Sequence, residues 1–192
     1  MSLKTGKQII QTEINALKEL LSNLDDSFEK TVTLLGRCNG KIIVTGVGKS
    51  GIVGQKIAAT LSSTGSRAVF LHASEAVHGD LGIIAENDVA IVISYSGETA
   101  EVLNVLAPIK RRGIPVVSIT GSPESTLAKK GDVHLDIMVR KESDPLGLAP
   151  TSSKTATLVL GDALAIALSQ AKNFTREEFH QFHPGGSLGK KL

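Results

Sequence analysis

The sequence predicts an α/β fold in which parallel strands form one sheet covered by helices on both faces. From about residue 41 onward, short apolar runs of strand length alternate with segments of helical periodicity. The apolar runs are continuous and rich in Val and Ile, as in Asp88–Ile93, and parallel strands buried on both faces have this character. Such sheets bind ligands beyond the carboxyl ends of their strands, near the point where the strand order reverses.

The first predicted elements are two helices that precede the sheet. Residues 4–23 carry apolar side chains at helical spacing, which predicts an amphipathic helix. Asp26 and Glu29 have capping-box spacing and open a second helix through about Gly36. These N-terminal helices, within residues 4–37, must bury their apolar stripes on the sheet or on a neighbouring subunit.

The remaining elements alternate along the chain. The predicted strands are residues 41–45, 68–71, 88–94, 115–120 and 133–139. The predicted helices are residues 49–63, 98–112, 153–172 and a short last helix capped by Thr175 and Glu178. Ser122 as N-cap and Pro123 at the first helical position predict one more helix after the fourth strand. Residues 72–82 are expected to be irregular or briefly helical, and residues 140–152 a long loop.

Length and composition favour a globular chain with one domain over residues 1–192. The net charge is +2, aromatic residues are 3% and Trp is absent, so a nucleic-acid surface is not expected. Cys38 is the only cysteine, which excludes an intrachain disulfide and indicates a reducing, cytoplasmic location. No apolar run approaches the ~18 residues of a membrane span, so no membrane association is expected.

The segment Ser94–Glu101 joins a predicted strand to a predicted helix and has the character of an anion site. It offers the hydroxyls of Ser94, Ser96 and Thr99, the glycine Gly97, and the free amides of a first helical turn. Outward N–H groups and the positive end of the helix dipole favour an anion there. The alternative is an ordinary turn and cap rich in Ser and Thr.

A second glycine-rich turn lies at Gly46–Gly51, between the first predicted strand and its helix. It matches G-x-G-x-x-G, but the end of the second strand has no Asp or Glu for a ribose, which argues against NAD. A Walker A loop would need glycine where Ile43 stands. The turn therefore lets the backbone approach a ligand, and Lys49, whose charge opposes the helix dipole, is either functional or a solvated surface lysine.

With these two turns and the motifs below, the chain resembles a sugar isomerase (SIS) domain, and more closely the D-arabinose-5-phosphate isomerases. The resemblance extends over nearly the whole chain from about residue 40 and rests on seven motifs. They are Gly46-x-Gly48-Lys49-Ser50-Gly51, Ser63-Thr64-Gly65, Glu75-Ala76-x-His78-Gly79-Asp80-Leu81-Gly82, Ser94-x-Ser96-Gly97-x-Thr99-x-Glu101, residues 145–153, Gly161-Asp162-Ala163-Leu164-Ala165, and His183-Pro184-Gly185-Gly186-x-Leu188-Gly189.

The resemblance implies a flavodoxin-like three-layer α-β-α sandwich with a five-stranded parallel sheet. It also implies a homo-oligomer, usually a tetramer with sites shared between subunits, and aldose–ketose isomerisation of D-ribulose 5-phosphate to D-arabinose 5-phosphate without a cofactor. Full-length members often continue past the equivalent of Leu192 into a paired regulatory CBS module. This sequence contains no such module, so it is either a single-domain form or a piece of a longer chain.

The family's functional residues fall on residues of matching type. They are Lys49, His78, Glu101, Glu142 and His183. The hypothesis for the phosphate is a cradle of hydroxyls and glycines from the two turns. Its members are Gly48, Ser50, Ser94, Ser96, Gly97 and Thr99.

Each of these residues also has a structural interpretation. Glu101 could only cap its helix, although Glu98 fits that part better and is not counted as catalytic. Glu142 could be a loop surface charge, and a lone His is often a surface or structural residue. Converging histidines could trap zinc as an inhibitor, but no helix has an i, i+4 His pair, so no built metal site is expected. Ile52 stands where many relatives carry His, which bears on metal sensitivity.

Two other functions remain as alternatives to the isomerase. One is a hexulose-6-phosphate isomerase, against which the motifs around His78 and His183 argue. The other is a non-catalytic module that senses a phosphosugar or nucleotide sugar. Such a sensor would need the serine loop but not all five of the ionisable residues.

Overall fold

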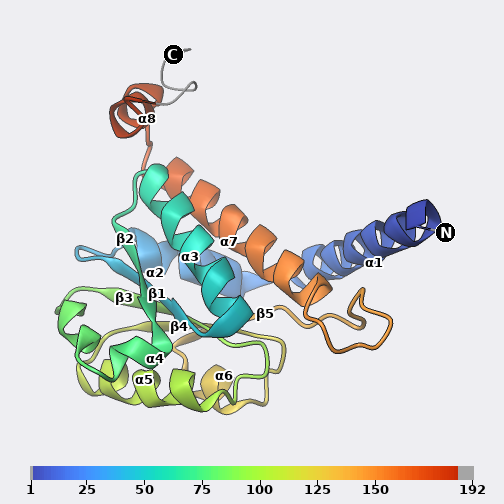
Figure 1. Cartoon of the computed structure of the whole chain (residues 1–192). Coiled ribbons are helices and arrows are strands. Elements are labelled where there is room, and N and C mark those ends of the chain that lie inside the picture. Colours follow the sequence, from blue (N-terminus) through green and yellow to red (C-terminus); the bar gives the residue numbers. More distant parts are fainter. Residues whose placement is uncertain (1, 186–192) are drawn as a thin grey trace.

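A computed structural model gives the structure of residues 2–185 (Figure 1). Its centre is a sheet of five parallel strands in the order β2-β1-β3-β4-β5. This order and the helices on both faces confirm the predicted flavodoxin-like sandwich. The strands are β1 (Ile42–Gly46), β2 (Ala68–His72), β3 (Val89–Ile93), β4 (Val116–Thr120) and β5 (Val133–Asp136).

The helices alternate with these strands as the sequence predicts. The long helices are α1 (Ser2–Asn23), α2 (Asp26–Gly36), α3 (Gly48–Ser63), α5 (Ala100–Arg111) and α7 (Ser152–Ala171). The short ones are α4 (Ala73–Ala76), the 3₁₀ helix η1 (Asp80–Ile83), α6 (Thr126–Lys130) and α8 (Arg176–Phe182). The predicted capping box of the last helix is confirmed, because Thr175 and Glu178 each accept a bond from the other's backbone amide.

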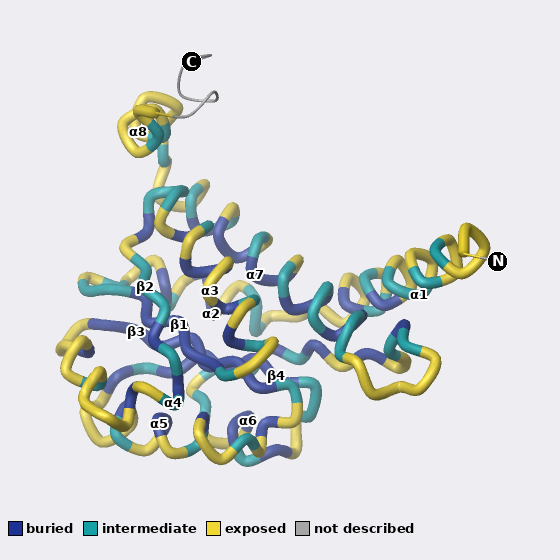
Figure 2. Tube along the Cα trace, viewed as in Figure 1, coloured by how far each residue is buried: buried dark blue, intermediate teal, exposed yellow. Residues whose placement is uncertain are grey.

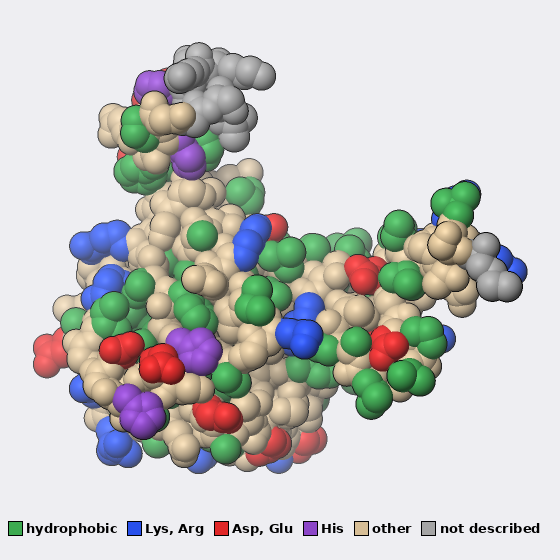
Figure 3. Space-filling view, viewed as in Figure 1, with side chains coloured by type: hydrophobic (Ala, Val, Ile, Leu, Met, Phe, Trp, Pro, Cys, Tyr) green, Lys and Arg blue, Asp and Glu red, His purple; other side chains and the backbone are tan. Residues whose placement is uncertain are grey.

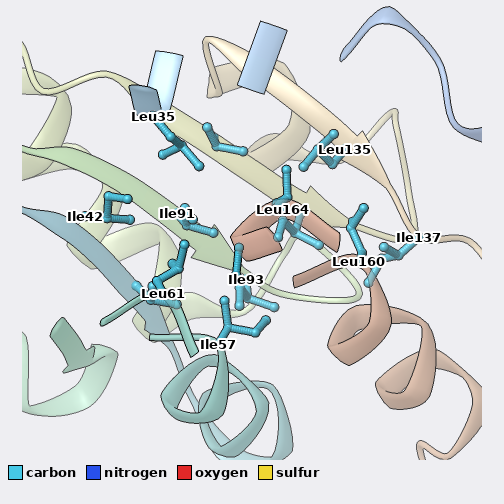
Figure 4. Packing of buried hydrophobic residues seen from close by; sticks show 14 of the residues in the cluster. Leu35, Ile42, Ile57, Leu61, Ile91, Ile93, Leu135, Ile137, Leu160 and Leu164 are labelled. Carbon is cyan, nitrogen blue, oxygen red and sulfur yellow. The ribbon is translucent and has the colours of Figure 1, made fainter. Parts of the chain in front are cut away.

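The two faces of the sheet have separate apolar cores. On one face α2, α3 and α7 cover β1, β3, β4 and β5, and the packed side chains include Leu35, Ile57, Ile91 and Leu164 (Figure 4). On the other face α4, α5 and α6 pack against the sheet. The close approach of α3 to α7 depends on Gly161, since a Cβ there would lie 2.4 Å from Ile57 Cδ1.

Helix α1 packs on α7 at only one end and extends away from the body of the protein (Figure 1). Ala16 and Leu20 are its buried residues, whereas most of its surface is exposed (Figure 2). Large apolar side chains remain uncovered along it, among them Leu21, which is 75% exposed. The structure therefore covers the stripe of α2 and part of that of α1, and leaves the rest of α1 open.

Two predicted helix N-caps are wrong. The N-cap of α2 is Asp25, whose carboxylate accepts from the amide of Ser27 at 2.8 Å, so Asp26 and Glu29 form no capping box. After β4, Ser122 and Pro123 do not open a helix. The carbonyl of Ser122 instead accepts from both the amide and the hydroxyl of Ser125, and this turn makes Ser125 the N-cap of α6.

Strand β5 is also shorter than the apolar pattern predicts. It ends at Asp136 rather than at residue 139, because its neighbour β4 ends at Thr120 and offers one last carbonyl to the amide of Ile137. The carboxylate of Asp136 then accepts from the amide of Met138 at 2.9 Å and turns the chain away.

Candidate functional site at the switch point of the sheet

The strand order reverses between β1 and β3, which lie side by side with their carboxyl ends at the same edge. Helix α3 begins at Gly48, two residues after β1, and α5 begins at Ala100, seven residues after β3. Two helix N-termini therefore open at one point, as predicted for ligand binding in sheets of this order. Gly48 has a φ of +57°, a conformation that glycine adopts without steric cost.

Both helix N-termini leave backbone amides without acceptors. In α3 the first intrahelical bond is from Gly51 to the carbonyl of Val47, and in α5 it is from Leu103 to that of Thr99. Within the described chain, the amides of residues 48–50 and 100–102 have no hydrogen-bond acceptor, and no side chain caps either helix. Six donors at the positive ends of two dipoles favour a bound anion.

The serine loop between β3 and α5 is held by its own hydroxyls. Ser94 is buried, and its Oγ lies 2.8 Å from Thr99 Oγ1 and accepts from the amide of Gly97 at 3.1 Å. One hydroxyl of the Ser94–Thr99 pair donates to the other, so one hydroxyl hydrogen remains available to a ligand. Ser96 is exposed and accepts from the amide of Glu98, which leaves its own hydrogen available as well.

Gly97 shapes this loop rather than offering a donor. Its amide is already bonded to the carbonyl and hydroxyl of Ser94, and its φ is +68°. A Cβ at this position would lie 2.0 Å from Ser125 Oγ, so a larger residue would collide with α6. Glu98 also faces α6, where its carboxylate accepts from the amide of Thr126 at 2.6 Å, and these bonds hold the pKa of Glu98 below its usual value. Glu98 therefore does not cap its own helix α5, the structural role that the sequence suggested for it, but binds the first amide of α6.

Ser50, in the first turn of α3, contacts Lys154, a residue that the sequence did not indicate. The ammonium of Lys154, on the first turn of α7, donates to Ser50 Oγ at 2.9 Å. The same nitrogen lies 5.5 Å from the centre of the Tyr95 ring, within the range of a cation–π contact. A lysine at the start of a helix opposes the dipole, and this signal, already used for Lys49, could have found Lys154.

Glu142 is not a solvated loop charge but the cap of α7. One carboxylate oxygen accepts from the amide of Thr151 at 2.8 Å, from its hydroxyl at 3.1 Å, and from the amide of Ser153 at 3.1 Å. Burial would raise the pKa of Glu142, but the hydrogen bonds from Ser153 and Thr151 outweigh it and leave the pKa below its usual value. The residue is therefore an ionised group, close enough to influence Tyr95 and Lys154 electrostatically.

The remaining predicted residues are distributed over both ends of the sheet. Lys49 and Glu101 are exposed on the first turns of α3 and α5, beside the open amides. His78 is exposed in the turn after α4, which follows the carboxyl end of β2. A cavity of about 690 Å³ adjoins that turn. It is lined by Gln55, Phe70, Leu71, His72, Glu75, Gly79, Asp80, Gly82 and Ile83.

His183 lies at the opposite end of the molecule. It follows α8, and its ring stacks on that of Phe179 with the ring centres 3.9 Å apart. Its Nδ1 lies 2.8 Å from the carbonyl oxygen of Phe179. Phe174, which leads into α8, packs beside Gly65, just before β2 begins. Because α7 has 20 residues, its two ends are about 30 Å apart. Within one chain the structure does not bring His183 to Ser50 and the serine loop.

The described residues hold no group of three or more His, Cys, Asp or Glu side chains placed to bind a metal ion. None of the helices in residues 2–185 combines the length and the apolar character that crossing a membrane requires. Another cavity, of about 620 Å³, lies at the amino-terminal edge of the sheet and contains none of the predicted site residues.

Comparison with known families shows the class of protein to which this fold and site belong. The family model of the SIS domain matches residues 35–167, and the chain belongs to this family. The chain is 52% identical, over 99% of its length, to arabinose 5-phosphate isomerase KdsD of Pseudomonas aeruginosa. It is 50% identical, over 98% of its length, to KdsD of Shigella flexneri. The chain spans 58% of the length of each of these curated relatives.

A solved structure of similar length is also similar in sequence and in fold. The structure of E. coli CFT073 c3406 in complex with arabinose 5-phosphate is 46% identical, with a TM-score of 0.92. The match covers 95% of this chain and 97% of that one.

Proposed function

We propose that this protein is an aldose–ketose isomerase that interconverts D-ribulose 5-phosphate and D-arabinose 5-phosphate. The observation that carries the proposal is the meeting of two uncapped helix N-termini and the serine loop at the switch point of the sheet. Such an arrangement suits a phosphate monoester. The names of the relatives, which are about 50% identical over nearly the whole chain, narrow the substrate to arabinose 5-phosphate.

The phosphate is held by neutral donors in this proposal. Ser50, Ser96 and one hydroxyl of the Ser94–Thr99 pair each have a hydrogen to donate. The free amides, which include that of Gly48, add further donors. Gly97 contributes by its backbone conformation, because its amide is occupied within the loop. Gripping the phosphate far from the reacting carbons lets its binding energy orient the sugar.

The reaction moves a proton between C1 and C2 through an enediol or enediolate. It needs a base near the C–H group, an acid, and a positive or hydrogen-bonding group beside the developing oxyanion. Glu101 and His78 are exposed and are the proposed proton-transfer groups, and Lys49 is the proposed electrophile. Glu142, with its lowered pKa and three donors, suits electrostatic stabilisation better than proton uptake.

We further propose a homo-oligomer, and specifically a tetramer, in which a second copy completes the site. His183 lies about the length of α7 away from the serine loop of its own chain, so only another copy could supply it. Hydrophobic side chains gather on the projecting part of the molecule that holds α1 (Figure 3). Those exposed on α1 and on the nearby loop are Leu3, Ile10, Ile14, Leu21, Leu146 and Leu148. An apolar surface of this kind is typical of subunit contacts.

A cytoplasmic location is the remaining part of the proposal. A pentose phosphate is an intracellular kind of substrate, and the single Cys38 is a free thiol that makes sulfur contacts with the carbonyls of Lys41 and Asn87. A chain of 192 residues with one free cysteine suits a reducing compartment.

The proposed activity is tested by incubating purified protein with D-arabinose 5-phosphate and measuring the ribulose 5-phosphate that forms. Turnover is expected, and His78→Ala and Glu101→Gln should each lower the rate by about 10²-fold or more, as for a lost general acid or base. Glu98→Gln is the matched control, because Glu98 lies in the same loop but bonds to α6, and its rate should stay close to wild type.

Tight phosphosugar binding without turnover would instead support a sensor. Wild-type rates in both His78→Ala and Glu101→Gln would remove the proposed roles of those residues while leaving the activity in place.

The shared site has its own measurement. The mass of the particle in solution at micromolar concentration is expected to correspond to several copies of the chain, and to four if the assembly is a tetramer. Leu21→Lys, which places a charge on the exposed apolar face of α1, should shift the assembly toward monomers and lower the rate. A monomer with full activity would contradict the shared site.

A further inference from the structure

The side chain of Lys154 reaches from α7 across the switch point to two other elements. Its ammonium donates to Ser50 Oγ on α3 at 2.9 Å and lies 5.5 Å from the centre of the Tyr95 ring, which follows β3. Both contacts are with groups that already belong to the candidate phosphate cradle or adjoin it. Ser50 is one of the proposed phosphate donors, and Tyr95 lies between Ser94 and Ser96 in the serine loop.

This ammonium is half-buried and forms no ion pair with any described residue. Glu142 is near enough to attract it, but the carboxylate oxygen that faces α7 is occupied by donors from Thr151 and Ser153. Burial accordingly lowers the pKa of Lys154 from its usual value, with the attraction of Glu142 acting in the opposite direction.

The position of Lys154 in its helix makes its positive charge still less favourable. It stands on the first turn of α7, where a positive charge opposes the helix dipole. The amides of residues 48–50 and 100–102, at the starts of α3 and α5, are also unpaired donors within the described chain. A half-buried cation among unpaired donors is destabilised until an anion supplies the missing charge.

We propose that Lys154 is a further substrate-binding residue of this site, whose ammonium contacts an anionic phosphate oxygen of the bound sugar phosphate. The inference rests on the proposed function and adds one formal positive charge to a cradle otherwise made of neutral donors. Lys154 then acts mainly on affinity and on the preference for phosphorylated over unphosphorylated sugars. Its hydrogen bond to Ser50 holds it in place while the site is empty.

The test compares Lys154→Met with wild type, using inorganic phosphate and D-arabinose 5-phosphate as ligands. Methionine keeps most of the stem over Tyr95 and removes the charge. Calorimetry should give a dissociation constant for inorganic phosphate that is about tenfold weaker or more, as for one lost charged hydrogen bond. The KM for D-arabinose 5-phosphate should rise by a similar factor, with kcat little changed.

Two variants control this measurement. Lys56→Met makes the same charge change elsewhere on α3. Lys56 forms a solvent-exposed ion pair with Asp162, so this variant should leave phosphate affinity unchanged. Lys154→Arg keeps the charge and should bind phosphate within a few-fold of wild type. If Lys154→Met does not fold, Lys154→Gln replaces it in the same comparison.

Three results would overturn the inference. They are unchanged phosphate affinity in Lys154→Met, an Arg variant as weak as the Met variant, or a fall in kcat with KM and phosphate affinity unchanged. The last would place the ammonium at the reacting carbons. If wild type fails to turn over D-arabinose 5-phosphate, the proposed function fails, but the phosphate-binding comparison still decides the part of Lys154.

Discussion

The two edges of the sheet differ in how their polar groups are satisfied. At the amino-terminal edge, the carboxylate of Asp88 is fully buried and accepts from the amides of Lys41 and Ala85 at 2.7 and 2.8 Å. The ammonium of Lys41 also forms an ion pair with the Asp88 carboxylate, at 3.2 Å. Nearby, Asp132 accepts from the amide of Val116, the first residue of β4, and pairs with Lys110.

At the carboxyl-terminal edge several polar groups of the described residues lack a partner. Six helix amides lack acceptors, and the ammonium of Lys154 has no ionic partner within the part of the chain that the structure covers. Three buried side-chain atoms in that same part have no hydrogen-bond partner. Thr45 Oγ1 and His72 Nδ1 lie at the ends of β1 and β2 on this edge, and Ser153 Oγ lies in the first turn of α7.

This difference separates stability from ligand binding within one sheet. At the amino-terminal edge, a buried charge whose hydrogen bonds are all made stabilises the loops that lead into the strands. Open donors and an unpaired cation cost stability and persist where a ligand can satisfy them. Substitutions at the amino-terminal edge should therefore change the free energy of unfolding, whereas those at the carboxyl-terminal edge should change activity.

The largest expected effect is that of Asp88→Ala, which breaks the closed edge. It removes the acceptor of two buried amides and leaves Lys41 without its partner, so the free energy of unfolding should fall by about 3 kcal/mol. Urea titration measures this loss. Activity assayed well below the unfolding transition should stay near wild type, because Asp88 lies at the far edge from the serine loop.

Asp132→Ala is the matched control for this prediction. Asp132 also accepts from a backbone amide and a lysine, but its side chain is 45% exposed, so water can replace it. The expected loss is about 1 kcal/mol or less. Equal losses in the two variants would contradict the importance of burial, and a large loss of activity in folded Asp88→Ala would break the separation of the edges.

The fold was predictable because each strand can be recognised from its own residues. Within the predicted strand at 88–94, residues 89–93 are all apolar and mostly β-branched, and β3 forms at Val89–Ile93. The start of α6 was not predictable, because Ser122 and Ser125 are both good N-caps. Contacts distant in sequence accompany the choice of Ser125, since Glu98 binds the amide of Thr126 and the carbonyl of Gly97 binds that of Leu127.

The site was predictable where its residues are neighbours in sequence. The serine loop and the turn at Gly48 could be placed because each follows a strand that the pattern predicts. The contact between Ser50 and Lys154 joins residues 104 apart, and only the packing of α3 on α7 creates it. The capping of α7 by Glu142 was equally hidden, since the carboxylate reaches Thr151 and Ser153 across a loop rather than at capping-box spacing.

A smaller expected effect on stability, with a clear effect on activity, belongs to Gly97→Ala at the open edge. The new Cβ would lie 2.0 Å from Ser125 Oγ and 2.4 Å from Ser125 Cβ, in a backbone with a φ of +68°. The loop must move away from α6, at a cost of about 1–2 kcal/mol in the free energy of unfolding. The displaced hydroxyls of Ser94 and Thr99 should lower kcat/KM for D-arabinose 5-phosphate by about 10–10²-fold.

Gly113→Ala separates backbone strain from displacement of the loop. Gly113 has a φ of +70°, nearly that of Gly97, but no described atom lies within 4 Å of the position that a Cβ would take there, and it follows α5 far from the serine loop. It should lose about 1 kcal/mol of stability through the left-handed backbone alone and keep its activity. If both variants lose stability equally and both keep their activity, the serine loop does not hold the substrate, and the contrast between the two edges loses its functional meaning.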